Sequence, residues 1–344
     1  TLIASLASGR VPDLCELKSV WLPRLLASDA LSDWSAGVAD LRDSVRGWEM
    51  CSVGETVYGL PWLLDARALF FNRELFKHAG LDSTRGPETW GELARDAAAI
   101  ERIGTGIHGL GLTASDGGRL LESFMPFAWG NGGEILSAGG DSSRFDSPEN
   151  REALAFFLGL RGAALVAPAG ALEREFKAGR LGLVTASASL LEQIAREAPS
   201  LRFGVELLPS PAPGRGTRAS YADGHVLASF RGARHKEAAL RLARFLLRPA
   251  NALALARAAA TVEPATRGAD TLASYAGLPG RLAFIRQLEI ARFTPVHAQW
   301  DSMELAIEAE LGRALDDRRS AAESTAAHAT ATVDRRLTGL IGRH

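Results

Sequence analysis

The sequence predicts an α/β protein, because short apolar runs of strand length alternate with longer helical segments along most of its 344 residues. At about 150 residues per domain, a chain of this length is expected to form about two domains. Hydrophobic residues make up 47% of the chain and charged residues 23%, so there is enough apolar side chain to bury a core. A mainly disordered chain is therefore excluded.

Three capping patterns predict where helices begin. Thr-Trp-Gly-Glu at 89–92 is a capping box that opens a helix over 90–100, because its hydroxyl and carboxylate satisfy free N–H groups of the first turn. Asp-Ser-Pro-Glu at 146–149 places a cap residue before a first-turn proline. Ser-Ala-Ala-Glu at 320–323 is a second capping box and predicts the start of the last helix.

The predicted strands are short apolar runs bounded by glycine or proline. They cover residues 57–64, 107–113, 181–186, 203–208 and 225–230. The run Pro-Ser-Pro-Ala-Pro-Gly-Arg-Gly at 209–216 predicts a surface loop. Two helical segments, 302–315 and 320–340, predict a helical hairpin packed on a lobe.

Charge and cysteine content exclude several classes of protein. Lys and Arg number 39 against 40 Asp and Glu, which argues against a nucleic-acid-binding protein because such proteins carry a basic excess. Two cysteines, Cys15 and Cys51, cannot form a disulfide framework or a four-cysteine zinc site, although one bridge or two reduced thiols both remain open. No apolar run of about 18 residues predicts a membrane span. The chain begins with Thr1 and shows no signal peptide.

Motifs for catalysis are absent from the sequence. There is no His-Glu-x-x-His, Gly-x-Ser-x-Gly or Walker-type loop, and the seven histidines show no metal-ligand spacing. We therefore expect a protein that is not an enzyme and that needs no cofactor or metal. A glycosidase would need a carboxylate pair, which sequence spacing does not reveal.

The most informative stretch combines Tyr-Gly-Leu-Pro at 58–61, Phe-Phe-Asn at 70–72, Ala-Gly-Leu at 79–81 and Pro-Glu-Thr-Trp-Gly-Glu-Leu at 87–93. It closely resembles the signature of the family 1 extracellular solute-binding proteins of bacterial ABC importers. Further matching motifs follow the family's order, and the resemblance covers nearly the whole chain. They are Ala-Ser-Gly-Arg-Val-Pro-Asp at 7–13, Ala-Trp-Gly-Asn-Gly-Gly at 128–133, Phe-Asp-Ser-Pro-Glu at 145–149, Phe-Lys-Ala-Gly-Arg at 176–180 and Ala-Asp-Gly-His-Val-Leu-Ala at 222–228.

This resemblance implies a type II periplasmic-binding-protein-like fold, with two α/β lobes joined by hinge strands and a ligand cleft between them. The expected first lobe is 1–66 plus 224–264, and the second is 67–223 plus 265–344 with the C-terminal helical hairpin. The implied crossings lie near 65–69, 221–224 and 262–267. Closure about such hinges would bury the ligand.

The resemblance also implies the function of a substrate-binding receptor. Such a receptor captures a carbohydrate (a mono- or short oligosaccharide, or a polyol) and delivers it to the transmembrane subunits of an ABC permease. The implied location is periplasmic or extracellular, with a membrane anchor left open, and the implied state is a monomer that binds no nucleic acid.

Two departures from the family pattern modify this expectation. Roughly 50–60 residues that form a strand, a helix and a second strand normally precede the Ala-Ser-Gly motif, so lobe 1 is expected to be incomplete at its N-terminus. Ser187-Ala-Ser189 replaces the usual Gly-Pro-Trp, and His225 replaces the Trp of Gly-Gly-Trp. The loss of two aromatic platforms argues against a long stacked oligosaccharide.

The first candidate ligand residues are Trp62, Asp65 and Arg67. Aromatic rings cover the apolar faces of a sugar, and charged side chains fork onto adjacent hydroxyls. In a strand, residues 65 and 67 point to the same face, so both charges could enter one cleft. The alternative is a salt-bridged pair or a solvated hinge.

The remaining candidates lie at the expected crossings or in nearby loops, and each has a structural alternative. Trp129 is either an aromatic platform for the ligand or a lid on the core. His225 is either a ligand residue or a structural histidine. Glu263 either contacts the ligand or forms part of a surface turn. The full set adds Tyr221, Asp223 and Trp300, the last of which could instead staple a helix N-terminus.

Rival functions stay open at this point. A receptor for a glycerol phosphate would need cationic groups or a helix N-terminus aimed at the phosphate, and Arg67 alone does not decide this. A sensory module, or a truncated remnant without transport activity, would share the same fold.

Overall fold

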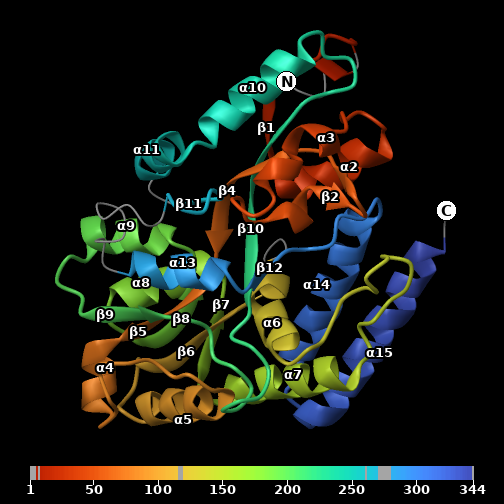
Figure 1. Ribbon diagram of the computed structural model, residues 1–344. Coiled ribbons are helices and arrows are strands. Elements are labelled where there is room, and N and C mark those ends of the chain that lie inside the picture. The colour runs from red at the N-terminus through yellow and green to blue at the C-terminus, as the bar shows by residue number, and fades with distance from the viewer. Residues whose placement is uncertain (1–4, 7, 115–118, 260–261, 270–279, 343–344) are drawn as a thin grey trace. The chain divides into compact units, whose positions relative to one another are not determined.

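The computed structural model describes residues 5–6, 8–114, 119–259, 262–269 and 280–342. The chain divides into two compact units (Figure 1). Unit 1 contains Thr1–Asp65, Ala222–Arg281 and Phe293–Trp300, and unit 2 contains Ala66–Tyr221, Leu282–Arg292 and Asp301–His344.

The unit boundaries differ from the expected lobes at four places, two of which are small: Ala66 belongs to unit 2, and Ala222 and Asp223 belong to unit 1. Residues 265–281 and 293–300, which we expected in lobe 2, belong to unit 1. Backbone and side-chain contacts hold the described part of the first segment there: Ala265 O accepts from Arg46 N at 2.9 Å, and the Thr266 hydroxyl donates to Leu247 O at 2.7 Å.

Unit 1 is built on a sheet in the order β1-β10-β4-β11, in which the pairs β1–β10 and β4–β11 are antiparallel. Its strands are β1 (Cys15–Lys18), β10 (Ser220–Ala228), β4 (Leu60–Ala66) and β11 (Glu263–Pro264). Gly224 is required where β10 approaches β4, because a Cβ there would lie 2.2 Å from Leu63 O. The other elements are α2 (Leu22–Ala27), α3 (Ser35–Val38), α10 (Lys236–Leu246), α11 (Pro249–Ala259), the hairpin β2 (Ser52–Val53) and β3 (Thr56–Val57), and the 3-10 turns Ser19–Trp21, Ala39–Leu41 and Trp48–Met50.

Unit 2 is built on a mixed sheet in the order β7-β6-β8-β5-β9. Its strands are β5 (Ala68–Asn72), β6 (His108–Thr113), β7 (Ala164–Ala167), β8 (Leu181–Ala186) and β9 (Phe203–Glu206). The pairs β6–β7 and β6–β8 are parallel, whereas β5 runs antiparallel to both of its neighbours. The short strand β12 (Ala291–Arg292) pairs in parallel with Ser220 and Tyr221 of β10.

Helices cover both faces of the unit 2 sheet: α4 and α5 lie on one side, and α8, α9 and α13 on the other (Figure 1). Phe70 on β5 contacts Phe176, Phe203 and Phe284, with ring centroids 6.0 Å apart in each pair. The helices are α4 (Arg73–His78), α5 (Trp90–Glu101), α6 (Arg119–Gly130), α7 (Pro148–Gly159), α8 (Ala169–Lys177), α9 (Ser189–Glu197), α13 (Arg281–Leu288), α14 (Trp300–Asp316) and α15 (Ala322–Ile341), with a 3-10 turn at Leu160–Ala163.

Two of the three predicted helix caps are confirmed. The Thr89 hydroxyl accepts from Glu92 N at 3.3 Å at the start of α5, and the Ser147 hydroxyl accepts from Asn150 N at 3.1 Å at the start of α7. The capping box at 320–323 is wrong: α15 begins at Ala322, and its N-cap residue Ala321 makes no side-chain cap bond. Asp317 organises this turn instead, since its carboxylate accepts from Ser320 N.

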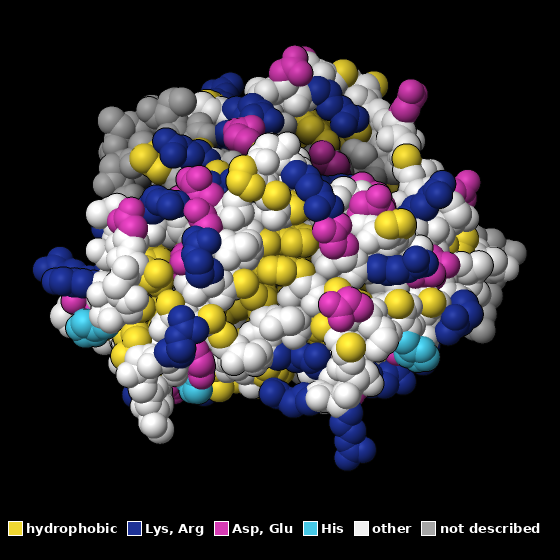
Figure 2. All heavy atoms as spheres, turned by 90° about the horizontal axis from the view of Figure 1, so that it is seen from below, with side chains coloured by type: hydrophobic (Ala, Val, Ile, Leu, Met, Phe, Trp, Pro, Cys, Tyr) yellow, Lys and Arg dark blue, Asp and Glu magenta, His cyan; other side chains and the backbone are white. Residues whose placement is uncertain are grey.

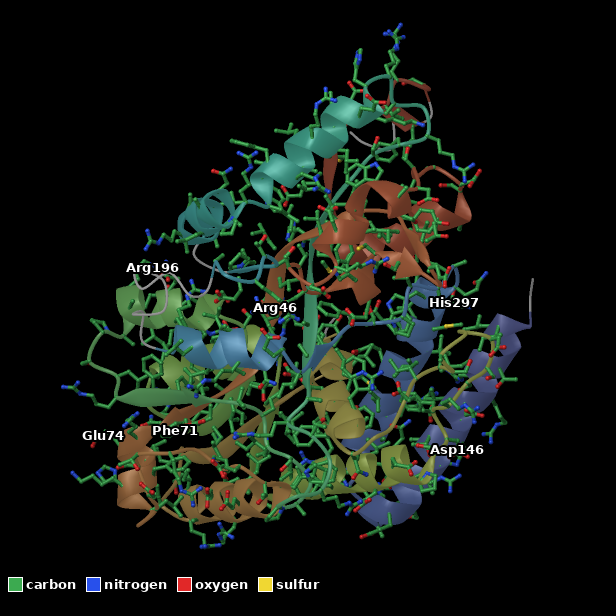
Figure 3. All side chains as sticks on the ribbon, viewed as in Figure 1. Arg46, Phe71, Glu74, Asp146, Arg196 and His297 are labelled. Carbon is green, nitrogen blue, oxygen red and sulfur yellow. The ribbon has the colours of Figure 1, made fainter. Side chains whose placement is uncertain are left out.

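The two predicted C-terminal helices are present as α14 and α15, and α15 packs against α7; their arrangement as a hairpin stays a prediction. The Asp146 carboxylate connects the start of α7 to α15, because it accepts from Thr330 Oγ1 at 2.8 Å and pairs with Arg151 at 2.7 Å (Figure 3).

On the face shown in Figure 2, basic and acidic side chains are interspersed, and neither sign of charge forms a separate patch. Within the described residues, none of the helices is long and apolar enough to cross a membrane.

Candidate functional site

Three of the predicted ligand residues, Arg67, Trp129 and Tyr221, lie together within unit 2, and Arg292 joins them. We call these four side chains the arginine–aromatic row. The Trp129 and Tyr221 rings are stacked, with centroids 6.1 Å apart and an interplanar angle of 15°. The Arg67 guanidinium lies 5.7 Å from the Tyr221 centroid, and that of Arg292 lies 5.4 Å from the Trp129 centroid. Each distance is within the range of a cation–π contact.

The backbone positions three members of the row. Arg67 lies between β4 and β5, and its amide donates to Tyr221 O at 3.1 Å. The Ser220 hydroxyl donates to Arg67 O at 2.6 Å. Because Arg292 of β12 pairs with Tyr221 of β10, the row is fixed by sheet hydrogen bonds. Trp129 comes from the last turn of α6.

Each arginine of the row is paired with a glutamate. Glu122 on α6 accepts from both Nε and Nη2 of Arg67, at 3.2 and 2.8 Å. Glu134, which follows α6, receives two parallel bonds of 2.7 Å from Arg292. The second pair is 41% exposed on both sides, whereas Arg67 and Glu122 are only 11% and 19% exposed. Both positive charges are therefore balanced locally.

Further carboxylates gather around Glu122 within unit 2. Glu308 on α14 accepts from Leu121 N, at 2.5 Å, in the first turn of α6. Burial, followed by the negative charges of Glu308, Glu122 and Asp301, raises the pKa of Glu304 to about 7. Glu304 lies one turn before Glu308, which places the two carboxylates on the same face of α14.

The other predicted ligand residues lie in unit 1. Trp62, Asp65, Asp223 and His225 are partly exposed residues of β4 and β10. The indole N–H of Trp62 is buried and has no hydrogen-bond partner among the described residues. The same is true of Trp300, which is 1% exposed at the start of α14.

Two of these unit 1 residues contact polar side chains of the same unit. His225 Nδ1 lies 2.5 Å from the Glu16 carboxylate on β1. Glu263 is 1% exposed and pairs with Arg281, which is 2% exposed, at 2.6 Å. Such contacts are typical of structural residues, and they make a ligand role for Glu263 the weaker interpretation.

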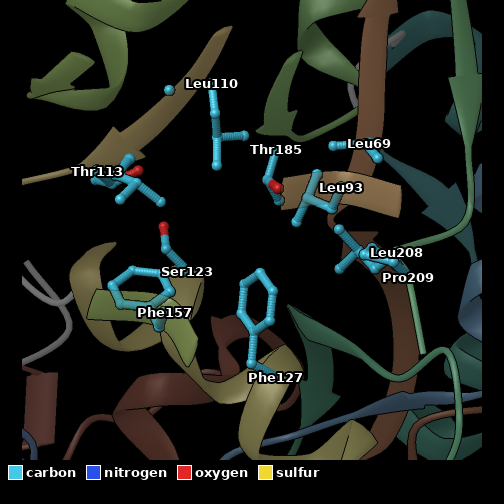
Figure 4. Close-up of a pocket in the computed structure, with 12 residues that line it drawn as sticks. Leu69, Leu93, Leu110, Thr113, Ser123, Phe127, Phe157, Thr185, Leu208 and Pro209 are labelled. Atoms are coloured by element: carbon cyan, nitrogen blue, oxygen red, sulfur yellow. The ribbon is translucent and has the colours of Figure 1, made fainter. Parts of the chain in front are cut away.

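The segment that replaces the family's aromatic motif forms a small hydroxyl pair. The Oγ atoms of Ser187 and Ser189 lie 2.7 Å apart, just before and at the start of α9. A small pocket is found elsewhere in unit 2, lined by Leu93, Leu110, Thr113, Phe127 and other side chains (Figure 4). Its volume of about 10 Å³ accommodates a single water and not a sugar.

The part of the chain that the structure describes contains no candidate metal site. No three His, Cys, Asp or Glu side chains there are grouped as metal ligands. Cys15 and Cys51 are both free, and burial raises the pKa of the Cys51 thiol.

Five residues of the site were missed by the sequence analysis. Glu122, Glu304 and Glu308 look like ordinary polar positions of helices, and Glu134 and Arg292 lie in segments without a recognisable motif. Only pairing in space distinguishes them, since Arg292 and Glu134 are 158 residues apart.

Comparison with known proteins identifies the class. A family model described as bacterial extracellular solute-binding protein matches residues 1–282, and the chain belongs to this family. Members of the family are substrate-binding receptors. A binding protein of Brucella abortus (strain 2308) is 29% identical over 255 residues, which are 72% of this chain and 60% of that protein. The chain thus spans about 60% of the length of that relative.

A further relative is the periplasmic sn-glycerol-3-phosphate-binding protein of Shigella dysenteriae serotype 1 (strain Sd197), 27% identical over 229 residues. The match covers 61% of this chain and 51% of that protein.

Solved structures show the same fold. The cyclic α-maltosyl-1,6-maltose binding protein of Arthrobacter globiformis matches with a TM-score of 0.87 and 24% identity, over 100% of this chain and 88% of the other. The sugar-binding protein MalE of Xanthomonas citri matches with a TM-score of 0.84 and 24% identity, over 98% and 87%. The predicted two-lobe periplasmic-binding-protein fold is thereby confirmed.

Proposed function

We propose that the protein is the substrate-binding receptor of an ABC importer, and that it captures a carbohydrate and delivers it to the transmembrane subunits of a permease. Family membership supports the receptor role, and the named ligands of the two sugar-binding structures support a carbohydrate. A periplasmic or extracellular location and a monomeric state belong to the same proposal.

The main observation in support of a carbohydrate ligand is the bidentate Arg292–Glu134 pair in the arginine–aromatic row. A guanidinium has five N–H donors and Glu134 engages two, so three remain to be matched to sugar hydroxyls. The glutamate accepts hydroxyl protons in return. Paired donors and acceptors of fixed geometry suit the vicinal hydroxyls of a sugar.

The rings of the row have a supporting role in this proposal. Trp129 is 4% exposed and Tyr221 is 2% exposed, and each carries an arginine against its ring. We propose that they hold the guanidinium planes rather than stack on the ligand. Arg67 and Glu122 would form a second polar fork, while Trp62, Asp65, Asp223, His225 and Trp300 stay candidates from unit 1.

A thermal-shift screen of the purified protein against sugars and polyols tests the proposal. A ligand at 100 times its dissociation constant adds about 2.7 kcal/mol to the free energy of unfolding, which a melting curve resolves. Arg292→Ala should abolish the shift. Arg180→Ala, which breaks the exposed pair of Arg180 with Glu175, should leave it unchanged. A screen in which no sugar raises the melting temperature contradicts a carbohydrate receptor.

A further inference from the structure

The charge balance of the arginine–aromatic row distinguishes between classes of ligand. This inference rests on the proposed function, because it takes the row as the ligand site. Both arginines are already matched: Arg67 by Glu122 at 2.8 Å and Arg292 by Glu134 at 2.7 Å. Glu308, whose carboxylate accepts from Leu121 N beside Glu122, adds a third carboxylate, so carboxylates outnumber the two arginines of the row.

A phosphate ligand needs cations whose charge is not already balanced, or the free N–H groups of a helix N-terminus. The helix that could serve is α6, whose first turn lies beside Arg67. Its Leu121 amide already donates to the Glu308 carboxylate, and Glu122 occupies the same turn. A phosphate dianion would therefore meet two balanced arginines and a helix end that a carboxylate has already capped.

We infer that the row selects an uncharged polyhydroxyl ligand and rejects phosphorylated solutes, including sn-glycerol 3-phosphate. The glutamates are the specificity-determining residues: Glu122 and Glu134 neutralise the arginines, and Glu308 occupies the anion-binding end of α6. One relative is named as an sn-glycerol-3-phosphate-binding protein and two solved structures with this fold as sugar-binding proteins, so we take the choice of ligand to depend on local charge.

The test measures binding of sn-glycerol 3-phosphate by isothermal titration calorimetry and thermal shift, with millimolar ligand and low salt. The wild-type protein, the variants Glu122→Gln and Glu134→Gln and their combination are compared. Glu175→Gln is the matched control, because it breaks an equally bidentate but exposed pair with Arg180. Melting temperatures without ligand identify any variant that is misfolded, and the second single variant then carries the test.

The wild type should show no binding, and unpairing an arginine should produce binding that is at least about tenfold tighter than any residual wild-type affinity. The Glu175→Gln control should gain nothing. Binding by the wild type that Arg292→Ala or Arg67→Ala removes would overturn the inference, as would folded glutamate variants that gain no affinity.

Together with the thermal-shift screen against neutral sugars, this experiment separates the inference from the proposed function. If no neutral sugar binds but the glutamate variants gain phosphate binding, the carbohydrate proposal fails and the charge argument stands. If a neutral sugar binds and the wild type also binds glycerol phosphate, the receptor role stands and the inferred selectivity fails.

Discussion

The environment of Glu304 changes the pKa of its carboxyl group, and this change has a measurable effect on stability. Burial and three neighbouring carboxylates raise its pKa to about 7 from 4.5. A raised pKa means that the folded state binds a proton more tightly than the unfolded state, so stability falls as the pH rises from about 4.5 to about 7. Glu304 is partly exposed, and after allowance for solvent screening this loss amounts to about 1–2 kcal/mol.

The variant Glu304→Gln should therefore be more stable than the wild type at pH 8 and equal to it at pH 4.5. The expected rise in melting temperature at pH 8 is about 2–4 °C. Melting curves from pH 4.5 to 8 measure the difference, with Glu74→Gln at an exposed position of α4 as the control. If both variants follow the wild-type curve, the carboxylate group around Glu304 does not repel as the structure indicates.

Individual residues of the candidate site were predictable only where a motif marked them. Arg67, Trp129 and Tyr221 lie in or beside stretches with the family pattern, and the structure places them together. Their charged partners come from elements distant in sequence, as Glu122 does for Arg67. No local pattern encodes such a pairing, because it depends on how strands and helices pack.

At the scale of elements, local chemistry predicted helix starts best. The Ser147 hydroxyl caps α7, because it is the residue before a first-turn proline and bonds to Asn150 N. The strand β5 was not among the predicted strands, although all five of its residues are buried. It follows β4 after one residue and lacks the turn that normally separates strands, so the sequence gives no signal for its start.

Ser147→Ala should lower the free energy of unfolding by about 1 kcal/mol, since the first turn of α7 loses a cap. Urea unfolding measures this loss. Ser320→Ala is the control, because Ser320 lies in the false capping box and the first residue of α15 comes two positions later. A larger loss for Ser320→Ala than for Ser147→Ala would contradict the assignment of the caps.

Arg161 joins two helix ends in unit 2. Its guanidinium donates to Leu158 O near the end of α7, and to Ala314 O and Leu315 O at the end of α14. Burial lowers the pKa of Arg161, and the carbonyl groups at the two helix ends stabilise its charge by accepting these hydrogen bonds.

Arg161→Met should destabilise the protein by about 2–3 kcal/mol, because a charged donor to several buried carbonyls is lost while the apolar stem is kept. Arg174→Met on α8 is the comparison, and its effect should be within about 0.5 kcal/mol. Urea unfolding measures the midpoint of each variant, and the two midpoints are compared with that of the wild type. Equal midpoints for the two variants would show that the helix ends do not depend on Arg161.

At the scale of the whole molecule, the chain forms two units with separate cores, and β4 and β10 each pass from one to the other. The sequence predicted the α/β class and two domains from length and alternation. The membership of residues 265–281 depends on long-range contacts, including the pairing of Glu263 with Arg281, and could not be inferred from local pattern.

Because that ion pair lies wholly within unit 1, breaking it should destabilise unit 1 selectively. Glu263→Gln removes the carboxylate that faces the buried Arg281 guanidinium at 2.6 Å, at a cost of about 3–5 kcal/mol. Native-state hydrogen exchange should then show amides of β1 and of Leu60–Asp65 exchanging about 100-fold faster, while β6 and β8 keep their protection. The double variant Glu263→Gln/Arg281→Met, which removes both charges, should recover much of the loss. Equal acceleration in β6 and β8 would mean that the two units unfold as one, against the separation of their cores.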